Sequence, residues 1–177
     1  ADLLIGTGAV VPHHIAGFSG GAKIIQPGVS GAATTAATHM FSARSSTPLL
    51  GHVDTPVRNE MELIAERCGM THILNVTLNA DGELVTAAFG ATRPTFRKLV
   101  LEAKNIYGIC TPKMLDIVIA GSHPCDIEFW QAHKSLYPAM LMVRPGGTII
   151  VVTPCPVGVS VTHRSLLAYA SEPAATI

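Results

Sequence analysis

The chain has 177 residues, 48% of them hydrophobic and 14% charged, and its 12 basic and 12 acidic residues give no net charge with neutral histidines. This hydrophobicity excludes intrinsic disorder, and the balanced charge without a basic block excludes the usual surface of a nucleic-acid-binding protein. No apolar run reaches the roughly 18 residues of a transmembrane helix and no signal-peptide pattern opens the chain, so we expect a cytoplasmic protein without membrane partners.

Short β-rich runs alternate with longer helical stretches, which predicts an α/β fold. Strands are expected at 3–6, 73–78, 84–89, 116–120 and 148–153. Helices are expected at 31–41, 56–68, 93–106, 126–143 and 162–171. The polar cluster at 79–82 lies between two expected strands and ends in glycine, which predicts a hairpin turn.

The last third of the chain has the pattern of a parallel sheet. Residues 115–121 are nearly all apolar, as in a strand that is covered on both faces. A helical stretch and a second apolar run at 146–152 follow, which predicts a β-α-β unit. The periodicity is interrupted at 108–113, so we expect two α/β subdomains, 1–108 and 109–177, the second with a parallel β-α-β sheet.

The segment 11–28 is the most informative about chemistry. It contains His13 and His14, followed by glycines at 17, 20 and 21 and by Lys23. Such glycines let a backbone approach a ligand closely and present N–H groups to an anion. Lys23 has apolar neighbours, where desolvation would favour the neutral, nucleophilic amine. His39 follows sixteen residues after the lysine.

This segment is not a phosphate-binding P-loop. Ala22 separates Gly21 from Lys23, and Ile24 stands where that motif needs a magnesium-binding Ser or Thr. Taken singly, each feature has an ordinary structural explanation: a turn histidine, a solvated lysine, a packed helical histidine or a tight glycine turn. The combination is what indicates a functional site.

The combination resembles the lactate racemase family of nickel-pincer-nucleotide enzymes. The matching residues are Pro12-His13, the run Ala16-Gly17-Phe18-Ser19-Gly20-Gly21-Ala22-Lys23, Pro27-Gly28 and His39. The resemblance implies that Lys23 is covalently bonded to a nickel pincer nucleotide (nickel pyridinium-3,5-bisthiocarboxylic acid mononucleotide). It also implies that His39 is a nickel ligand and that His13 is one of two acid/base residues.

A second similarity lies in the other half of the chain. Gln131-Ala132-His133-Lys134 is similar to the Q-A-x-K segment of the same family, which implies that Gln131 and Lys134 contact the substrate. Residues three apart share a helix face, so both side chains can reach one ligand. The implied partner is a small-molecule 2-hydroxy acid. A solvated helix lysine is the alternative explanation of Lys134.

The family resemblance implies a racemase or epimerase that acts by hydride transfer with histidine acid/base catalysis. In that family a second catalytic histidine and the phosphate-binding residues precede the lysine motif. We therefore expect a central fragment, with 1–108 from the family's N-terminal domain and 109–177 from the start of its C-terminal domain, inactive on its own. Two alternatives are a divalent-metal hydrolase that uses His13, His14 and His39, and a non-catalytic ligand-binding homologue.

Overall fold

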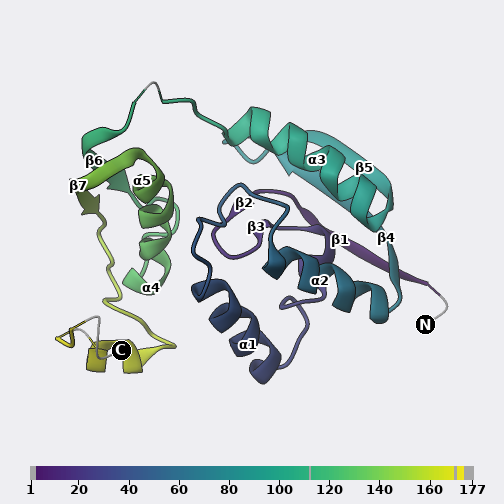
Figure 1. Cartoon of the computed structure of the whole chain (residues 1–177), viewed down its shortest axis with the longest axis horizontal. Helices are drawn as coiled ribbons and strands as arrows, with labels where there is room; N and C mark the ends of the chain where they lie inside the picture. The colour runs from purple at the N-terminus through teal and green to yellow at the C-terminus, as the bar shows by residue number, and fades with distance from the viewer. Residues whose placement is uncertain (1–2, 112, 170, 174–177) are drawn as a thin grey trace. The chain divides into compact units, whose positions relative to one another are not determined.

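The computed structural model describes residues 3–111, 113–169 and 171–173. The chain divides into two compact units, Ala1–Cys110 and Thr111–Ile177. Strands and helices alternate in both (Figure 1), so the expected α/β fold is confirmed. Within the described residues, no helix combines the length and the apolar composition that crossing a bilayer requires.

The first unit contains a mixed three-stranded sheet. The central strand β4 (Met70–Leu78) pairs in parallel with β1 (Leu4–Ala9) and antiparallel with β5 (Leu84–Ala91). The expected hairpin turn between β4 and β5 is present, with the Asn79 N–H donating to the Glu83 carbonyl at 3.0 Å. Each strand extends beyond one predicted end, β1 and β5 at the carboxyl end and β4 at the amino end, because the apolar pattern marks the core of a strand better than its limits.

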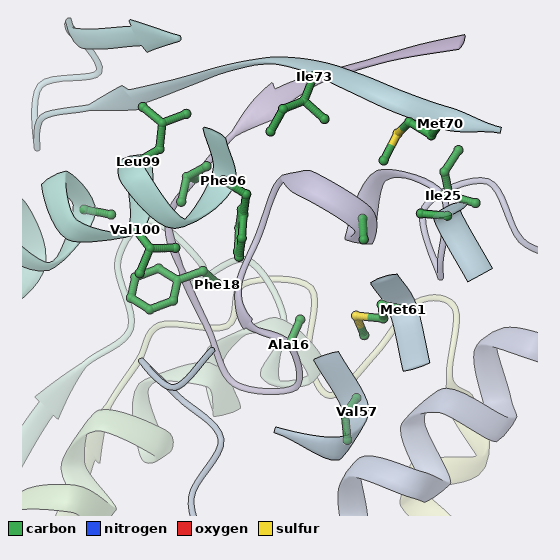
Figure 2. Packing of buried hydrophobic residues seen from close by; sticks show 14 of the residues in the cluster. Ala16, Phe18, Ile25, Val57, Met61, Met70, Ile73, Phe96, Leu99 and Val100 are labelled. Atoms are coloured by element: carbon green, nitrogen blue, oxygen red, sulfur yellow. The ribbon is translucent and has the colours of Figure 1, made fainter. Parts of the chain in front are cut away.

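The α-helices described in this unit are α1 (Ala32–Ala43), α2 (Pro56–Arg67) and α3 (Thr92–Tyr107). Helix α2 begins where the sequence predicts, because Pro56 occupies its first turn and the Thr55 hydroxyl accepts from the Arg58 N–H at 3.1 Å. The core lies between the helices and the sheet. Figure 2 shows its packing, to which α2 contributes Val57, Met61 and Ala65, and α3 contributes Phe96, Leu99, Val100 and Ala103.

Short elements between β1 and α1 are absent from the sequence prediction. Strands β2 (Pro12–His13) and β3 (Gly17–Phe18) form a small antiparallel ribbon, and the 3₁₀ helix η1 (Gly21–Ile24) follows. Two-residue strands have no periodicity from which they could be predicted. This ribbon and turn carry His13 and Lys23, two of the three candidate residues of the first unit.

The second unit contains strands β6 (Leu115–Gly121) and β7 (Val143–Val152), which pair in parallel as predicted. The expectation that the first of these strands is covered on both faces is wrong within this unit. Val118 is buried, but Ile117 and Ile119 are 60% and 70% exposed. The unit places α5 (Leu136–Met142) against the two strands, and the side chains that alternate with Val118 point to the opposite face.

The prediction of one continuous helix at 126–143 is wrong. The helical stretch starts later than predicted and is interrupted. It comprises α4 (Phe129–Ala132), the 3₁₀ turn η2 (His133–Ser135) and α5. Its expected first turn does not form because the carbonyls of Asp126 and Ile127 accept instead from the Cys155 and Val157 N–H groups.

The predicted helix 162–171 is also corrected. The structure has a 3₁₀ helix, η3 (Arg164–Tyr169), and residue 170 lies outside the described residues. The Leu166 N–H bonds to the carbonyl of His163, three residues before it, rather than to one four residues before it.

Candidate functional site

Lys23 lies in the tight turn η1, where Ala22 separates it from the glycine pair Gly20-Gly21. Gly21 takes a φ of +53°, and a Cβ added there would lie 2.4 Å from the Arg58 guanidinium and 2.8 Å from the Phe96 ring. The fold of the turn therefore requires glycine at position 21, independently of any ligand.

Polar side chains from distant segments hold this turn. The buried Asn75 of β4 accepts from the Gly21 N–H at 2.7 Å through Oδ1. The Ser19 hydroxyl donates to the Ala9 carbonyl at 2.6 Å and accepts from the Val11 N–H at 3.0 Å. Because these bonds fix the backbone on both sides of Gly20, the position of Lys23 is defined by the core.

Arg58 is a further residue of the site that sequence reasoning missed. It is 1% exposed, its guanidinium donates to the carbonyls of Phe18 and Gly20 at 3.2 and 3.3 Å, and it lies 3.6 Å from the centre of the Phe96 ring. Burial lowers the pKa of Arg58 to about 10, an effect that the neighbouring Glu62 opposes. The spacing of Arg58 and Glu62, four residues apart on the predicted helix, is the signal that could have indicated it.

His39 lies on α1, within electrostatic reach of Lys23. Burial and the positive charge of Lys23 both lower the pKa of His39, in that order of importance. The lowered pKa favours the neutral imidazole at neutral pH, which is the form that binds metals. Lys23 is thus near enough to His39 to disfavour its charged form, although sixteen residues separate them.

His13 lies on β2 and is oriented by its own turn. Its Nδ1 accepts from the N–H groups of Ile15 and Ala16 at 3.2 and 3.3 Å, and its ring stacks on His14 at 4.9 Å. A nitrogen that accepts has no proton, so the neutral ring carries its proton on Nε2. In this conformation Nε2 is the protonated nitrogen of the His13 ring.

The three histidines of the hydrolase alternative do not make a metal centre. Among the residues that the structure describes, no three His, Cys, Asp or Glu side chains are grouped so that they could hold a metal ion. His39 offers one imidazole beside Lys23, and His13 and His14 stack on each other.

Gln131 and Lys134 belong to the second unit, on α4 and η2. The Lys134 amine donates to Gln131 Oε1 at 2.5 Å, so the two side chains lie together on the surface of that unit. The ring of Trp130 stacks on His163 at 4.1 Å between ring centres, which fixes the preceding position of the motif.

Comparison with known proteins gives one domain family, the lactate racemase N-terminal domain, which matches residues 1–49. That range includes all three candidate residues of the first unit, His13, Lys23 and His39.

Two curated proteins are similar over most of the chain. Lactate racemase from Thermoanaerobacterium thermosaccharolyticum is 30% identical over 161 residues, which cover 88% of this chain and 37% of that protein. Lactate racemase from Lactiplantibacillus plantarum is 31% identical over 161 residues, which cover 86% of this chain and 37% of that protein. The chain thus spans little more than a third of the length of these relatives.

Two solved structures are similar to this chain over most of its length. The lactate racemase apoprotein from Thermoanaerobacterium thermosaccharolyticum superimposes with a TM-score of 0.84 at 29% identity, over 90% of this chain and 39% of that one. A protein from Thermotoga maritima superimposes with a TM-score of 0.59 at 25% identity, over 82% of this chain and 37% of that one.

Proposed function

Because the chain is lactate racemase-like over most of its length, we propose that it is the central part of an enzyme that interconverts the enantiomers of a 2-hydroxy acid. Lactate is the proposed substrate, since both curated relatives are named for it. The observation that carries this proposal is the match of the segment containing His13, Lys23 and His39 to the lactate racemase N-terminal domain.

The donor set suits a cofactor that brings its own metal ligands. A bare metal ion would need three or four protein ligands, and the described residues offer no such group. A nickel pincer nucleotide would need only a primary amine for covalent attachment and one neutral imidazole. Lys23 Nζ would be the point of attachment and His39 the nickel ligand, and the lowered pKa of His39 favours that role.

Inversion at C2 of a 2-hydroxy acid requires breaking a C–H bond beside a carboxylate. Removal of a proton would build a second negative charge next to the first. Removal of hydride from C2 and of a proton from the hydroxyl instead gives a neutral ketone, the 2-keto acid, and their return to the opposite face gives the other enantiomer. When bound, the nickel pincer nucleotide would supply the hydride-accepting centre.

His13 would manage the proton of the hydroxyl at Nε2. A histidine suits this step because its ordinary pKa, about 6.5, lies near neutrality. In the described conformation Nε2 carries the proton, so acceptance there requires the other tautomer and the release of Nδ1 from Ile15 and Ala16. Those bonds are long and share one acceptor, so we expect them to break when substrate binds, with Nε2 losing its proton to solvent and Nδ1 gaining one from solvent.

Lys134 and Gln131 would bind the carboxylate of the substrate. An ammonium group pairs with a carboxylate as a compact charge, and the hydrogen bond to Gln131 orients it. The second acid/base residue and the phosphate-binding residues implied by the family would be supplied by other parts of the protein.

The test is the mass of the Lys23 peptide in the full-length protein, purified from cells that make the cofactor. We expect an adduct of several hundred daltons, lost in Lys23→Ala and also in Lys23→Arg, which keeps the charge but has no primary amine. Lys98→Arg on the exposed side of α3 is the matched control and should keep both adduct and racemisation.

Other outcomes would replace the proposal. Stoichiometric zinc without an adduct would favour the hydrolase, and neither metal nor adduct would favour a ligand-binding homologue. A Lys23→Ala protein that racemises a 2-hydroxy acid at the parent rate would show that the amine has no role.

A further inference from the structure

Arg58 is buried at a position where an apolar side chain would be expected. It lies on the face of α2 that contacts the core, between Val57 and Met61, and is 1% exposed. Removing a guanidinium from water costs several kcal/mol, and a buried ion pair often stabilises a fold no better than apolar residues of the same size. Global stability is therefore a poor explanation of this arginine.

One side of Arg58 is held by its surroundings in the core. Its Nε lies 3.5 Å from Glu62, whose carboxylate also pairs with Arg93 at 2.9 Å. The guanidinium stacks on the Phe96 ring. A cation between a buried carboxylate and an aromatic face has a single well-defined orientation.

The other side of Arg58 meets the turn that bears Lys23. Its two terminal nitrogens donate to the carbonyls of Phe18 and Gly20. The Gly20 carbonyl also accepts from the backbone N–H of Lys23, at 3.2 Å. One oxygen thus joins the buried guanidinium to the backbone of the candidate attachment residue.

We propose that Arg58 is a positioning residue, which fixes the Gly20 carbonyl and through it the direction in which Lys23 presents its amine. Glu62 keeps the guanidinium in place. This inference rests on the proposed function of Lys23, because a turn without an attached group would need no such support.

A lysine at position 58 could not hold the Phe18 and Gly20 carbonyls in this way. The planar fork of an arginine donates to two carbonyls at once, whereas an ammonium on a single stem is a point charge without that geometry. Arg58→Lys therefore keeps the buried charge and removes the fork. Arg58→Met keeps the length and removes the charge.

The test compares these variants in the full-length, cofactor-free protein by hydrogen exchange of the Lys23 amide and of the Leu99 amide in α3. In Arg58→Lys we expect the Lys23 amide to exchange about tenfold faster, as for the loss of one charge-assisted hydrogen bond, while the Leu99 amide is unchanged. Arg97→Lys is the matched control, because Arg97 of α3 forms an exposed pair with Asp54, which precedes α2.

A second measurement is the rate at which an acylating reagent modifies Lys23 Nζ, read by peptide mass. The acylation rate of Lys23 should differ from that of the parent in Arg58→Lys and not in Arg97→Lys. After purification from cells that make the cofactor, Arg58→Lys should carry less adduct on Lys23 than the parent does. Unchanged Lys23 exchange and acylation would overturn the inference. So would equal acceleration of the Lys23 and Leu99 amides, or unfolding of both Arg58 variants, because Arg58 would then support the whole core. Absence of an adduct in the parent protein would contradict the proposed function alone.

Discussion

Gln26 and Thr38 form a buried hydrogen bond, 2.6 Å from Nε2 to Oγ1, that joins the turn carrying Lys23 to the helix carrying His39. Gln26 follows the lysine by three residues, and Thr38 immediately precedes the histidine. Both side chains are 4% exposed. The distance between the candidate attachment residue and the candidate nickel ligand is therefore set by two polar side chains inside the protein.

Loss of either partner should destabilise the first unit, but unequally. Thr38→Val leaves the Gln26 amide buried without its acceptor, and Gln26 Oε1 already has no partner. Gln26→Met removes both polar atoms and keeps the chain length. We expect Thr38→Val to lower the free energy of unfolding by about 2 kcal/mol and Gln26→Met by about 1 kcal/mol, measured by urea denaturation.

The matched control is Thr34→Val, at an exposed position one turn earlier on α1, which should change the free energy of unfolding by less than about 0.5 kcal/mol. The reverse order, with Gln26→Met the more destabilised protein, would contradict the assignment of this bond.

His39 should titrate below its ordinary pKa of 6.5 in the cofactor-free protein, because burial and Lys23 both disfavour its charged form. Lys23→Met removes only the second cause, so it should raise the pKa of His39 part of the way back. Proton NMR of the imidazole Cε1–H against pH measures both values. A His39 pKa that is the same in both proteins would show that the two groups do not interact.

The same shift predicts how stability depends on pH. Below pH 6.5 the unfolded chain takes up a proton at His39 before the folded chain does, so protonation favours unfolding. The contribution of His39 to stability is complete above the unfolded pKa and is lost as the pH falls toward the folded one. This loss should be smaller in Lys23→Met, measured as urea midpoints between pH 7 and 5.

The sequence was sufficient for those parts of the fold that depend on local pattern. The spacing of His13, Lys23 and His39 carried the family resemblance. Helical periodicity predicted α2 to within one residue, and the polar cluster at 79–82 predicted the β4–β5 hairpin correctly. The supports of the site were not predictable in this way. Asn75 lies 54 residues from the Gly21 that it holds, so its part depends on how the chain folds back on itself.

The interrupted helix of the second unit has the same kind of cause. Its apolar spacing continues through 126–143, but the carbonyls that would begin it are taken by N–H groups near residues 155–157. Local propensity is overridden wherever a distant segment offers the backbone another partner.

Gly17 should be far more sensitive to alanine than Gly51, although both have a positive φ, +74° and +79°. A Cβ on Gly17 would lie 1.6 Å from the His52 carbonyl oxygen, whereas nothing lies within 4 Å of one on Gly51. We expect Gly51→Ala to cost about 1–2 kcal/mol through its backbone alone. Gly17→Ala should cost more than about 3 kcal/mol, because the ribbon must move. Similar urea midpoints for the two variants would show that the ribbon is loosely packed.

Two substitutions of His13 distinguish its structural role in the turn from its proposed role in proton transfer. Asn places an acceptor oxygen near the position of Nδ1, whereas Gln places a polar group near Nε2. His13→Asn should therefore keep the bonds from Ile15 and Ala16, with stability within about 0.5 kcal/mol of the parent, and His13→Gln should lose about 1 kcal/mol.

Both variants should fail to racemise a 2-hydroxy acid in the loaded full-length protein, because an amide side chain is too weak a base to take the hydroxyl proton near neutral pH. His14→Asn is the control, because the proposal gives His14 no proton transfer. This variant should retain most of the racemase activity. Nitrogen-15 shifts of the parent imidazole should identify Nδ1 as the unprotonated atom in the absence of substrate. If His13→Asn is as active as the parent, His13 supports the turn and another group moves the proton. A protonated Nδ1 would instead show that the Ile15 and Ala16 bonds do not persist in solution.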